Sequence, residues 1–148
     1  MLTNPRKKNL PMSETTLLAV NGTLMRGLKL NPNMLNVGGR FVREDHTDEH
    51  YRIWSVNDDH PGMMRVTEGG TAVALEVWEL PMASFAALLL SEPAGLCIGK
   101  LQLRNGQEML GVLAEPWRIE GQLEITRFGG WRAYMDQQDR AGSAAFRI

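Results

Sequence analysis

A glycine-bounded segment near the start of the chain carries residue types that could bind a small anion. Residues 21–27 read NGTLMRG and follow a short apolar run. Backbone N–H groups in such a turn can form a concave nest for a carboxylate or an oxyanion. Thr23 would add a hydroxyl group and Arg26 a positive charge. The residues alone leave a second interpretation open, a tight turn that needs glycine only for a positive φ.

Three glutamates could donate or accept a proton near such a segment. Glu76 and Glu79 lie in the apolar run VALEVWEL, where alternate side chains face opposite sides of a strand. A carboxyl group in these surroundings could have a raised pKa and act as a general acid or base, or it could point to water. Glu92, just before Pro93 at the end of a predicted helix, is the other candidate base. The alternative interpretation of Glu92 is an exposed residue at the end of that helix.

The basic residues are mostly arginine, twelve against four lysines. The planar guanidinium group binds a carboxylate through two parallel hydrogen bonds, so this ratio suits a site for small carboxylates. Codon usage, with most arginines on solvated strand faces, is the alternative explanation.

Composition excludes several classes of protein. The chain has 148 residues, 43% of them hydrophobic, and a formal net charge of −1, which fits one globular domain and argues against nucleic-acid binding. The single Cys97 excludes a disulfide within the chain. No apolar stretch of about 18 residues could span a membrane, so we expect a cytoplasmic protein without membrane association.

Common catalytic fingerprints are absent from the sequence. It contains no GxSxG, no GxxxxGK[ST] and no GxGxxG after a predicted strand, so we expect no cofactor. His46 and His50 have the i, i+4 spacing of some metal ligands, but they lie in an acidic segment without helical periodicity. We interpret them as solvated loop histidines and predict no metal site.

Alternating apolar residues and turn signals predict a chain rich in antiparallel strands. The runs 38–45 and 51–56 should pair antiparallel across an exposed acidic connection over 44–49. A turn over 58–62 follows them, and Asn105-Gly106 is the strongest hairpin signal. The segment 26–34 should be a loop or one short helical turn. The predicted strands are 15–20, 38–45, 51–56, 63–70, 71–80, 99–105, 107–116 and 117–121.

One main helix is predicted over 82–92, where MASFAALLLSE follows Pro81. Residues 128–140 could form a short turn or a closing helix. We therefore predict an α+β domain over 15–148 with a strongly curved, barrel-like sheet. Residues 1–14 contain two prolines and no apolar periodicity, and we expect a disordered or extended tail there.

Several runs of residues resemble known families. The run NGTLMRG resembles the YGTLMRG-type substrate loop of γ-glutamylcyclotransferase-like proteins, with Asn21 at the aromatic position. More of the chain, about residues 17–135, resembles the C-terminal domain of allophanate hydrolase, which has the same fold. The runs that carry this second resemblance are LKLN, VGGRFVR, YRIW, PGMMRV, EGGTAVALEVWELP, GLCIGKLQL, GVLAEPW and ITRFGGWRAY.

This resemblance implies a mixed, barrel-like sheet of the γ-glutamylcyclotransferase-like class and a role in urea or allophanate nitrogen metabolism. In that family the C-terminal domain is implicated in the breakdown of N-carboxycarbamate, which follows an amidase step. Two departures stand out: the histidine of the typical GAHLSG loop falls at Leu24, and the catalytic glutamate of cyclotransferases is matched only approximately by Glu92.

The roles that we assign are hypotheses. We assign the binding of an anion by backbone N–H groups to the loop. Arg26 or Arg40 would pair with a carboxylate, and Glu76 or Glu92 would transfer a proton. The candidate substrate-binding residues are Asn21, Gly22, Thr23, Leu24, Arg26, Gly27 and Arg40, and the candidate catalytic residues are Glu76 and Glu92.

Three functions follow from these assignments. The first is a stand-alone enzyme acting on an N-carboxycarbamate-type intermediate, with a separately encoded amidase as partner. The second is a γ-glutamylcyclotransferase that forms 5-oxoproline. The third is a non-catalytic binding or assembly module, and a homodimer is expected by analogy with the family.

Overall fold

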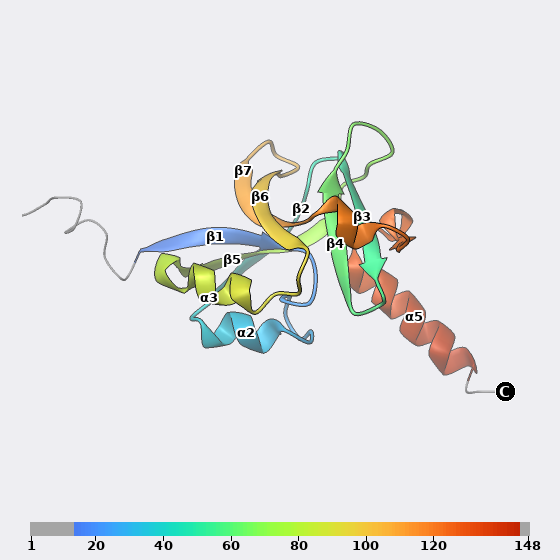
Figure 1. Cartoon of the computed structure of the whole chain (residues 1–148), viewed down its shortest axis with the longest axis horizontal. Helices are drawn as coiled ribbons and strands as arrows, with labels where there is room; N and C mark the ends of the chain where they lie inside the picture. Colours follow the sequence, from blue (N-terminus) through green and yellow to red (C-terminus); the bar gives the residue numbers. More distant parts are fainter. Residues whose placement is uncertain (1–13, 146–148) are drawn as a thin grey trace, which may run out of the picture.

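The computed structural model describes residues 14–145 and contains two β-sheets with helices at their margins (Figure 1). The larger sheet has the strand order β2-β5-β1-β7-β6, and the smaller sheet has the order β4-β3-β8. The strands of the larger sheet are β1 (Thr15–Val20), β2 (Arg40–His46), β5 (Ala74–Pro81), β6 (Leu96–Gln102) and β7 (Glu108–Ala114). Those of the smaller sheet are β3 (Tyr51–Val56), β4 (His60–Arg65) and β8 (Leu123–Glu124).

β1 lies at the centre of the larger sheet because its apolar side chains are covered on both sides. Leu18, Ala19 and Val20 are fully or almost fully buried. β1 pairs antiparallel with β5 and parallel with β7. The last residues of β1 therefore lead the chain directly from the core into residues 21–27.

The pairing and the length of β2 correct two predictions from the sequence. The runs predicted as strands at 38–45 and 51–56 form β2 and β3, but these strands do not pair with each other: β2 pairs with β5, and β3 pairs with β4. Alternation specifies which side of a strand is buried but not which strand is its partner. β2 also continues through Glu44 to His46 instead of ending at an exposed acidic connection.

The turn between β3 and β4 is shorter than predicted. Asn57 and Asp58 adopt left-handed backbone conformations, with φ values of 54° and 57°, which suits a tight hairpin. β4 then begins at His60, inside the segment predicted as a turn. As a result, His60 has a strand conformation and its side chain is buried.

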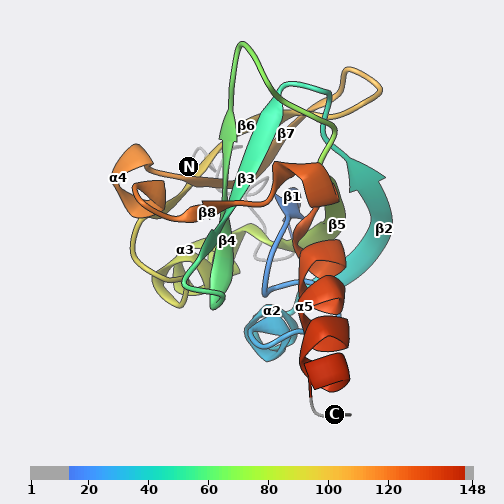
Figure 2. The same ribbon diagram turned by 90° about the vertical axis from the view of Figure 1, so that its right-hand side faces the viewer.

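The helices differ from the prediction in their lengths and in which of them is the longest. The segment after Pro81 forms a 3₁₀ turn, η1 (Met82–Ser84), and then α3 (Phe85–Leu90), which is shorter than the predicted main helix. The longest helix is α5 (Trp131–Ala145), which extends beyond the sheets toward the C-terminus (Figures 1 and 2). Its composition is too polar to indicate a main helix, and two buried aromatic residues, Trp131 and Tyr134, fix it to the core.

Three further helical segments are short. α2 (Asn31–Asn36) is the short helical turn that was expected, and it buries Met34. α4 (Pro116–Ile119) replaces the strand predicted over 117–121, because Pro116 occupies the first turn of a helix, where its missing N–H costs nothing. η2 (Thr126–Phe128) is a 3₁₀ turn before α5.

The fold class is confirmed as α+β, but the sheet does not close into a barrel; it remains two separate sheets. The hairpin at Asn105-Gly106 is confirmed between β6 and β7. Apart from Glu14, the predicted tail lies outside the described residues. None of the helices in residues 14–145 has the length and apolar character of a membrane span.

Candidate functional site

Residues from four parts of the chain line a small pocket, which we call the loop pocket. Residues 21–24 come from the segment after β1, His60 from the start of β4, and Glu92 from the connection after α3. Val20, Pro61, Leu96 and Val112 complete the lining. The pocket has a volume of about 10 Å³, which is room for about one water molecule. A larger ligand therefore requires movement of the lining side chains.

Buried amide side chains hold the loop in place. The Asn21 Nδ2 donates to the carbonyl oxygen of Val112 in β7 over 2.8 Å, and the Asn31 Nδ2 donates to the Leu24 carbonyl oxygen over 2.9 Å. Within residues 14–145, the backbone N–H groups of Gly22, Thr23 and Leu24 donate to no protein acceptor. These N–H groups belong to residues that line the pocket, so they can serve a bound anion.

The two glycines of the loop have different roles: Gly22 is required by a close approach, whereas Gly27 has the positive φ of the alternative interpretation. A Cβ atom at Gly22 would lie 2.6 Å from the Cδ and 2.7 Å from the Cγ of Pro61. Gly27 does have a positive φ, 73°, with nothing close to its missing Cβ. The contact between Gly22 and Pro61 joins the loop to the start of β4, next to His60.

We expect Gly22→Ala to lower the free energy of unfolding by about 1–3 kcal/mol, because the rigid proline ring cannot move aside without shifting the backbone. Chemical denaturation monitored by tryptophan fluorescence would measure the change. Gly142→Ala is the matched control: Gly142 is an exposed helical residue with open space around it, so alanine there should stabilise slightly. Equal midpoints for Gly22→Ala and the wild type would contradict the packing argument.

Glu92 is a half-buried carboxyl group without a hydrogen-bonding partner for one of its oxygens. The Glu92 Oε2 is buried and has no partner among the described residues. Burial raises the pKa of Glu92 to about 7. At neutral pH the group is therefore partly protonated, and it can both donate and accept a proton. The exposed helix end that the sequence left open as its alternative is not what the structure shows.

His60 is a pocket residue that the sequence analysis missed. Its side chain is 4% exposed, and its Nε2 has no partner within the described residues. On the other side of the ring, Nδ1 lies 3.1 Å from the Asp59 Oδ2. The sequence placed His60 in a turn; the signal that could have found it is its position directly before the apolar run PGMM.

Glu76 holds the far end of the loop and does not line the loop pocket. Its carboxylate accepts hydrogen bonds from the Arg26 backbone N–H, the Arg26 Nε, the Trp78 Nε1 and the Arg132 Nη2, over 2.9–3.2 Å. Burial alone would raise the pKa of Glu76, but these donors hold it below its usual range. Neither of the two alternatives from the sequence holds for Glu76: its pKa is lowered, and its side chain is buried instead of pointing to water. The carboxyl group is therefore ionised at neutral pH.

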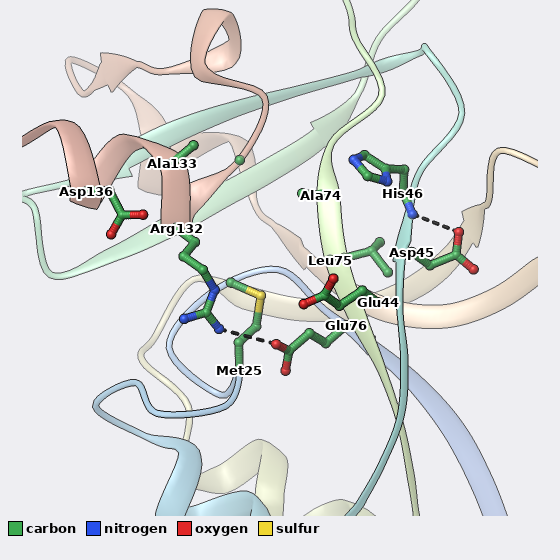
Figure 3. A pocket seen from close by; sticks show the side chains of 11 residues that line it. Met25, Glu44, Asp45, His46, Ala74, Leu75, Glu76, Arg132, Ala133 and Asp136 are labelled. Atoms are coloured by element: carbon green, nitrogen blue, oxygen red, sulfur yellow. Dashed lines mark hydrogen bonds and ion pairs between the residues drawn. The ribbon is translucent and has the colours of Figure 1, made fainter.

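A second, more open depression lies beside Glu76, and we call it the acidic hollow (Figure 3). It has a volume of about 300 Å³. Figure 3 shows Arg132 of α5 pointing toward Glu76 of β5 across it. The titratable residues that line it are Glu44, Asp45, His46, Glu76, Arg132 and Asp136. Although it is larger than the loop pocket, its four carboxyl groups make it unsuitable for a dicarboxylate ligand.

The two candidate arginines lie outside the loop pocket. The Arg26 guanidinium pairs with Glu76 and Glu44 and lies 3.6 Å from the centre of the Phe41 ring. Arg40, at the start of β2, pairs with Glu79 over 2.5 Å and is mostly exposed. The structure therefore brings residues 21–24 together with Glu92 and His60, and separates them from both arginines. A role of Arg26 or Arg40 in substrate binding stays a prediction.

The mixed larger sheet and the antiparallel smaller sheet, with the helices at their margins, have the arrangement of the γ-glutamylcyclotransferase-like fold class. A mouse aig2-like protein, 16% identical with a TM-score of 0.54, shares this fold. Within this fold class the chain belongs to a narrower family. The family model of the allophanate hydrolase C-terminal domain matches residues 16–136, and the chain belongs to that family.

Similar proteins support this assignment. The crystal structure of a uropathogenic E. coli-specific protein has a TM-score of 0.82 and 70% identity, covering 83% of this chain and 97% of that one. Kluyveromyces lactis allophanate hydrolase has a TM-score of 0.80 and 26% identity, over 84% of this chain and 21% of that one. Urea amidolyase of Saccharomyces cerevisiae is 28% identical over 131 residues. That match covers 84% of this chain but only 7% of the relative.

Proposed function

We propose that this chain binds N-carboxycarbamate in the loop pocket and promotes its decarboxylation, as a member of the allophanate hydrolase C-terminal domain family. The observation that carries the proposal is that residues 21–24 and the half-buried Glu92 carboxyl group line the same pocket in a chain of this family. The chain spans less than a tenth of the curated relatives that it matches, and an amidase activity must supply the substrate.

The reaction needs a proton at one atom. N-carboxycarbamate has two carboxylates on one nitrogen, and loss of CO₂ breaks one C–N bond. The electron pair stays on nitrogen, which takes a proton to give carbamate. Protonated Glu92 is the donor that we assign, because its pKa of about 7 lets it deliver a proton near neutral pH and recover it from water.

Orientation of the substrate would come from the loop. The backbone N–H groups of Gly22, Thr23 and Leu24 can bind the carboxylate that stays, since no protein acceptor within residues 14–145 uses them. The aliphatic Leu24 cannot exchange a proton. Glu92 thus remains the proton donor, and the loop contributes binding.

The test is a coupled assay in which an amidase domain without its C-terminal domain converts allophanate in the presence of this chain. Membrane-inlet mass spectrometry would follow the release of CO₂. We expect the wild-type chain to accelerate this release over the spontaneous rate, and Glu92→Gln to lose 10²-fold or more of the acceleration. Glu68→Gln changes an exposed carboxylate outside the pocket and should leave the rate unchanged.

A wild-type chain that does not change the rate of CO₂ release would contradict the decarboxylase proposal. If the chain then forms a complex with the amidase by size-exclusion chromatography, the assembly-module function takes its place. A homodimer would be detected in the same measurement from the mass of the chain alone.

A γ-glutamylcyclotransferase is the second candidate, and the half-buried Glu92 is the observation that favours it. Cyclisation requires a base that removes a proton from an α-amino group, which then attacks the γ-carbonyl and releases the amine. Formation of 5-oxoproline from γ-glutamyl peptides, abolished in Glu92→Gln, would support this function over the first.

A further inference from the structure

His60 contributes an unpartnered ring nitrogen to the loop pocket. Its side chain is 4% exposed, and its Nε2 donates to nothing and accepts from nothing within the described residues. Leaving a buried polar atom without a partner costs about 1–3 kcal/mol, so such an atom calls for an explanation. The Glu92 Oε2 is the other side-chain atom in residues 14–145 in this condition, and it belongs to the same pocket.

The other ring nitrogen of His60 is fixed by a chain of polar contacts. Nδ1 lies 3.1 Å from the Asp59 Oδ2, and the Asp59 Oδ1 accepts a hydrogen bond of 2.7 Å from the Lys29 Nζ. Hydrogen bonds from Lys29 and His60 hold the pKa of Asp59 below its usual range, so Asp59 is an ionised acceptor. Nδ1 must then donate to Asp59, which leaves Nε2 as the ring nitrogen that is available to another partner.

The lining of the loop pocket contains no lysine or arginine among the described residues. Its titratable groups are the Glu92 carboxyl and the His60 imidazole. A dicarboxylate needs at least one positive partner in a site this enclosed, because an unpaired buried charge is strongly unfavourable. His60 is the residue of the lining that can provide one.

We propose, resting on the proposed function, that His60 binds a carboxylate of the substrate by donating a hydrogen bond from Nε2, while Asp59 accepts from Nδ1. His60 is then the residue that determines specificity for a dianion over a monoanion. Leu24 lines the same pocket and is aliphatic, so the imidazole of the site comes from β4 and not from the loop.

Malonate is the probe for this inference, since it replaces the nitrogen of N-carboxycarbamate with CH₂ and is stable. The chain has three histidines, so a ¹H–¹³C spectrum of the imidazole Cε1 groups contains three resonances, which His46→Gln, His50→Gln and His60→Gln would assign. We expect added malonate to shift the His60 resonance to that of a doubly protonated ring and to leave the others in place.

Affinities measured by calorimetry give the second readout. We expect His60→Gln to weaken malonate binding tenfold or more and to remove the preference for malonate over malonamate, which carries one charge. Asp59→Asn should weaken binding in the same direction without changing a pocket residue. His46→Gln is the matched control, because His46 lines the acidic hollow, and it should bind malonate as the wild type does.

The outcomes separate this inference from the proposed function. Equal malonate affinity in His60→Gln and the wild type overturns the role of His60 but leaves the loop pocket as the site. A shift of His46 in place of His60 puts the ligand in the acidic hollow and contradicts both. If malonate changes none of the three resonances, the role of His60 is wrong, and the CO₂ assay then decides the proposed function by itself.

Discussion

Glu76→Ala is expected to lower the free energy of unfolding by about 3–5 kcal/mol. The Glu76 side chain is 3% exposed, and its carboxylate accepts hydrogen bonds from four donors. The guanidinium groups of Arg26 and Arg132 are partly exposed and can turn to water. The Arg26 backbone N–H and the Trp78 indole cannot do so as easily, and each costs about 1–3 kcal/mol when it loses its acceptor.

The control for Glu76→Ala is Glu79→Ala in the same strand. Glu79 is on the other face and forms an exposed ion pair with Arg40, so its removal should change the urea midpoint little. Similar losses in the two variants would mean that position in the strand, and not the buried network, determines the effect.

The pH dependence of the Glu76 contribution has a definite sign. The pKa of Glu76 is lowered from its usual 4.5 in the folded protein, so the carboxylate stabilises the fold above about pH 4.5. This stabilisation is lost as the pH falls toward the folded-state pKa. The stability difference between the wild type and Glu76→Ala should therefore shrink on acidification below pH 4.5.

Glu92→Gln is expected to stabilise the protein at alkaline pH by about 3 kcal/mol. The pKa of Glu92 is raised from 4.5 to about 7 by burial, so folding favours the protonated carboxyl. That stability is present in full below pH 4.5 and is lost as the pH rises through 7. A glutamine is neutral at every pH, so the variant does not lose it.

The measurement is the difference in unfolding free energy between Glu92→Gln and the wild type, at pH 4.5 and at pH 8.5. The difference should be small at the lower pH and large at the higher one, and Glu68→Gln, an exposed control, should show no such change. A difference that is independent of pH would mean that Glu92 is not desolvated. A variant that gains stability while losing activity is typical of a residue retained for function.

The sequence located much of the candidate site but grouped it incorrectly. Residues 21–24 and Glu92 were predicted as site residues, and the structure places them in one pocket. Arg26 and Glu76, which are also candidates from the sequence, pair with each other outside that pocket, and their roles on substrate stay predictions. His60 was assigned to a turn, and it is the buried imidazole of the pocket. Residue types identify groups that can do chemistry, whereas their partners decide which groups are free to do it.

What the sequence determined by itself depends on local patterns and on family resemblance. The buried strand 15–20, the hairpin at Asn105-Gly106 and the α+β class follow from periodicity and turn chemistry, and the resemblance over about 17–135 agrees with the matched family model. Only the tertiary structure decided that β2 pairs with β5, and that β4 brings His60 beside the loop. Strand pairing and the pKa of a carboxyl group both depend on contacts between residues far apart in the chain, and no local pattern records those contacts.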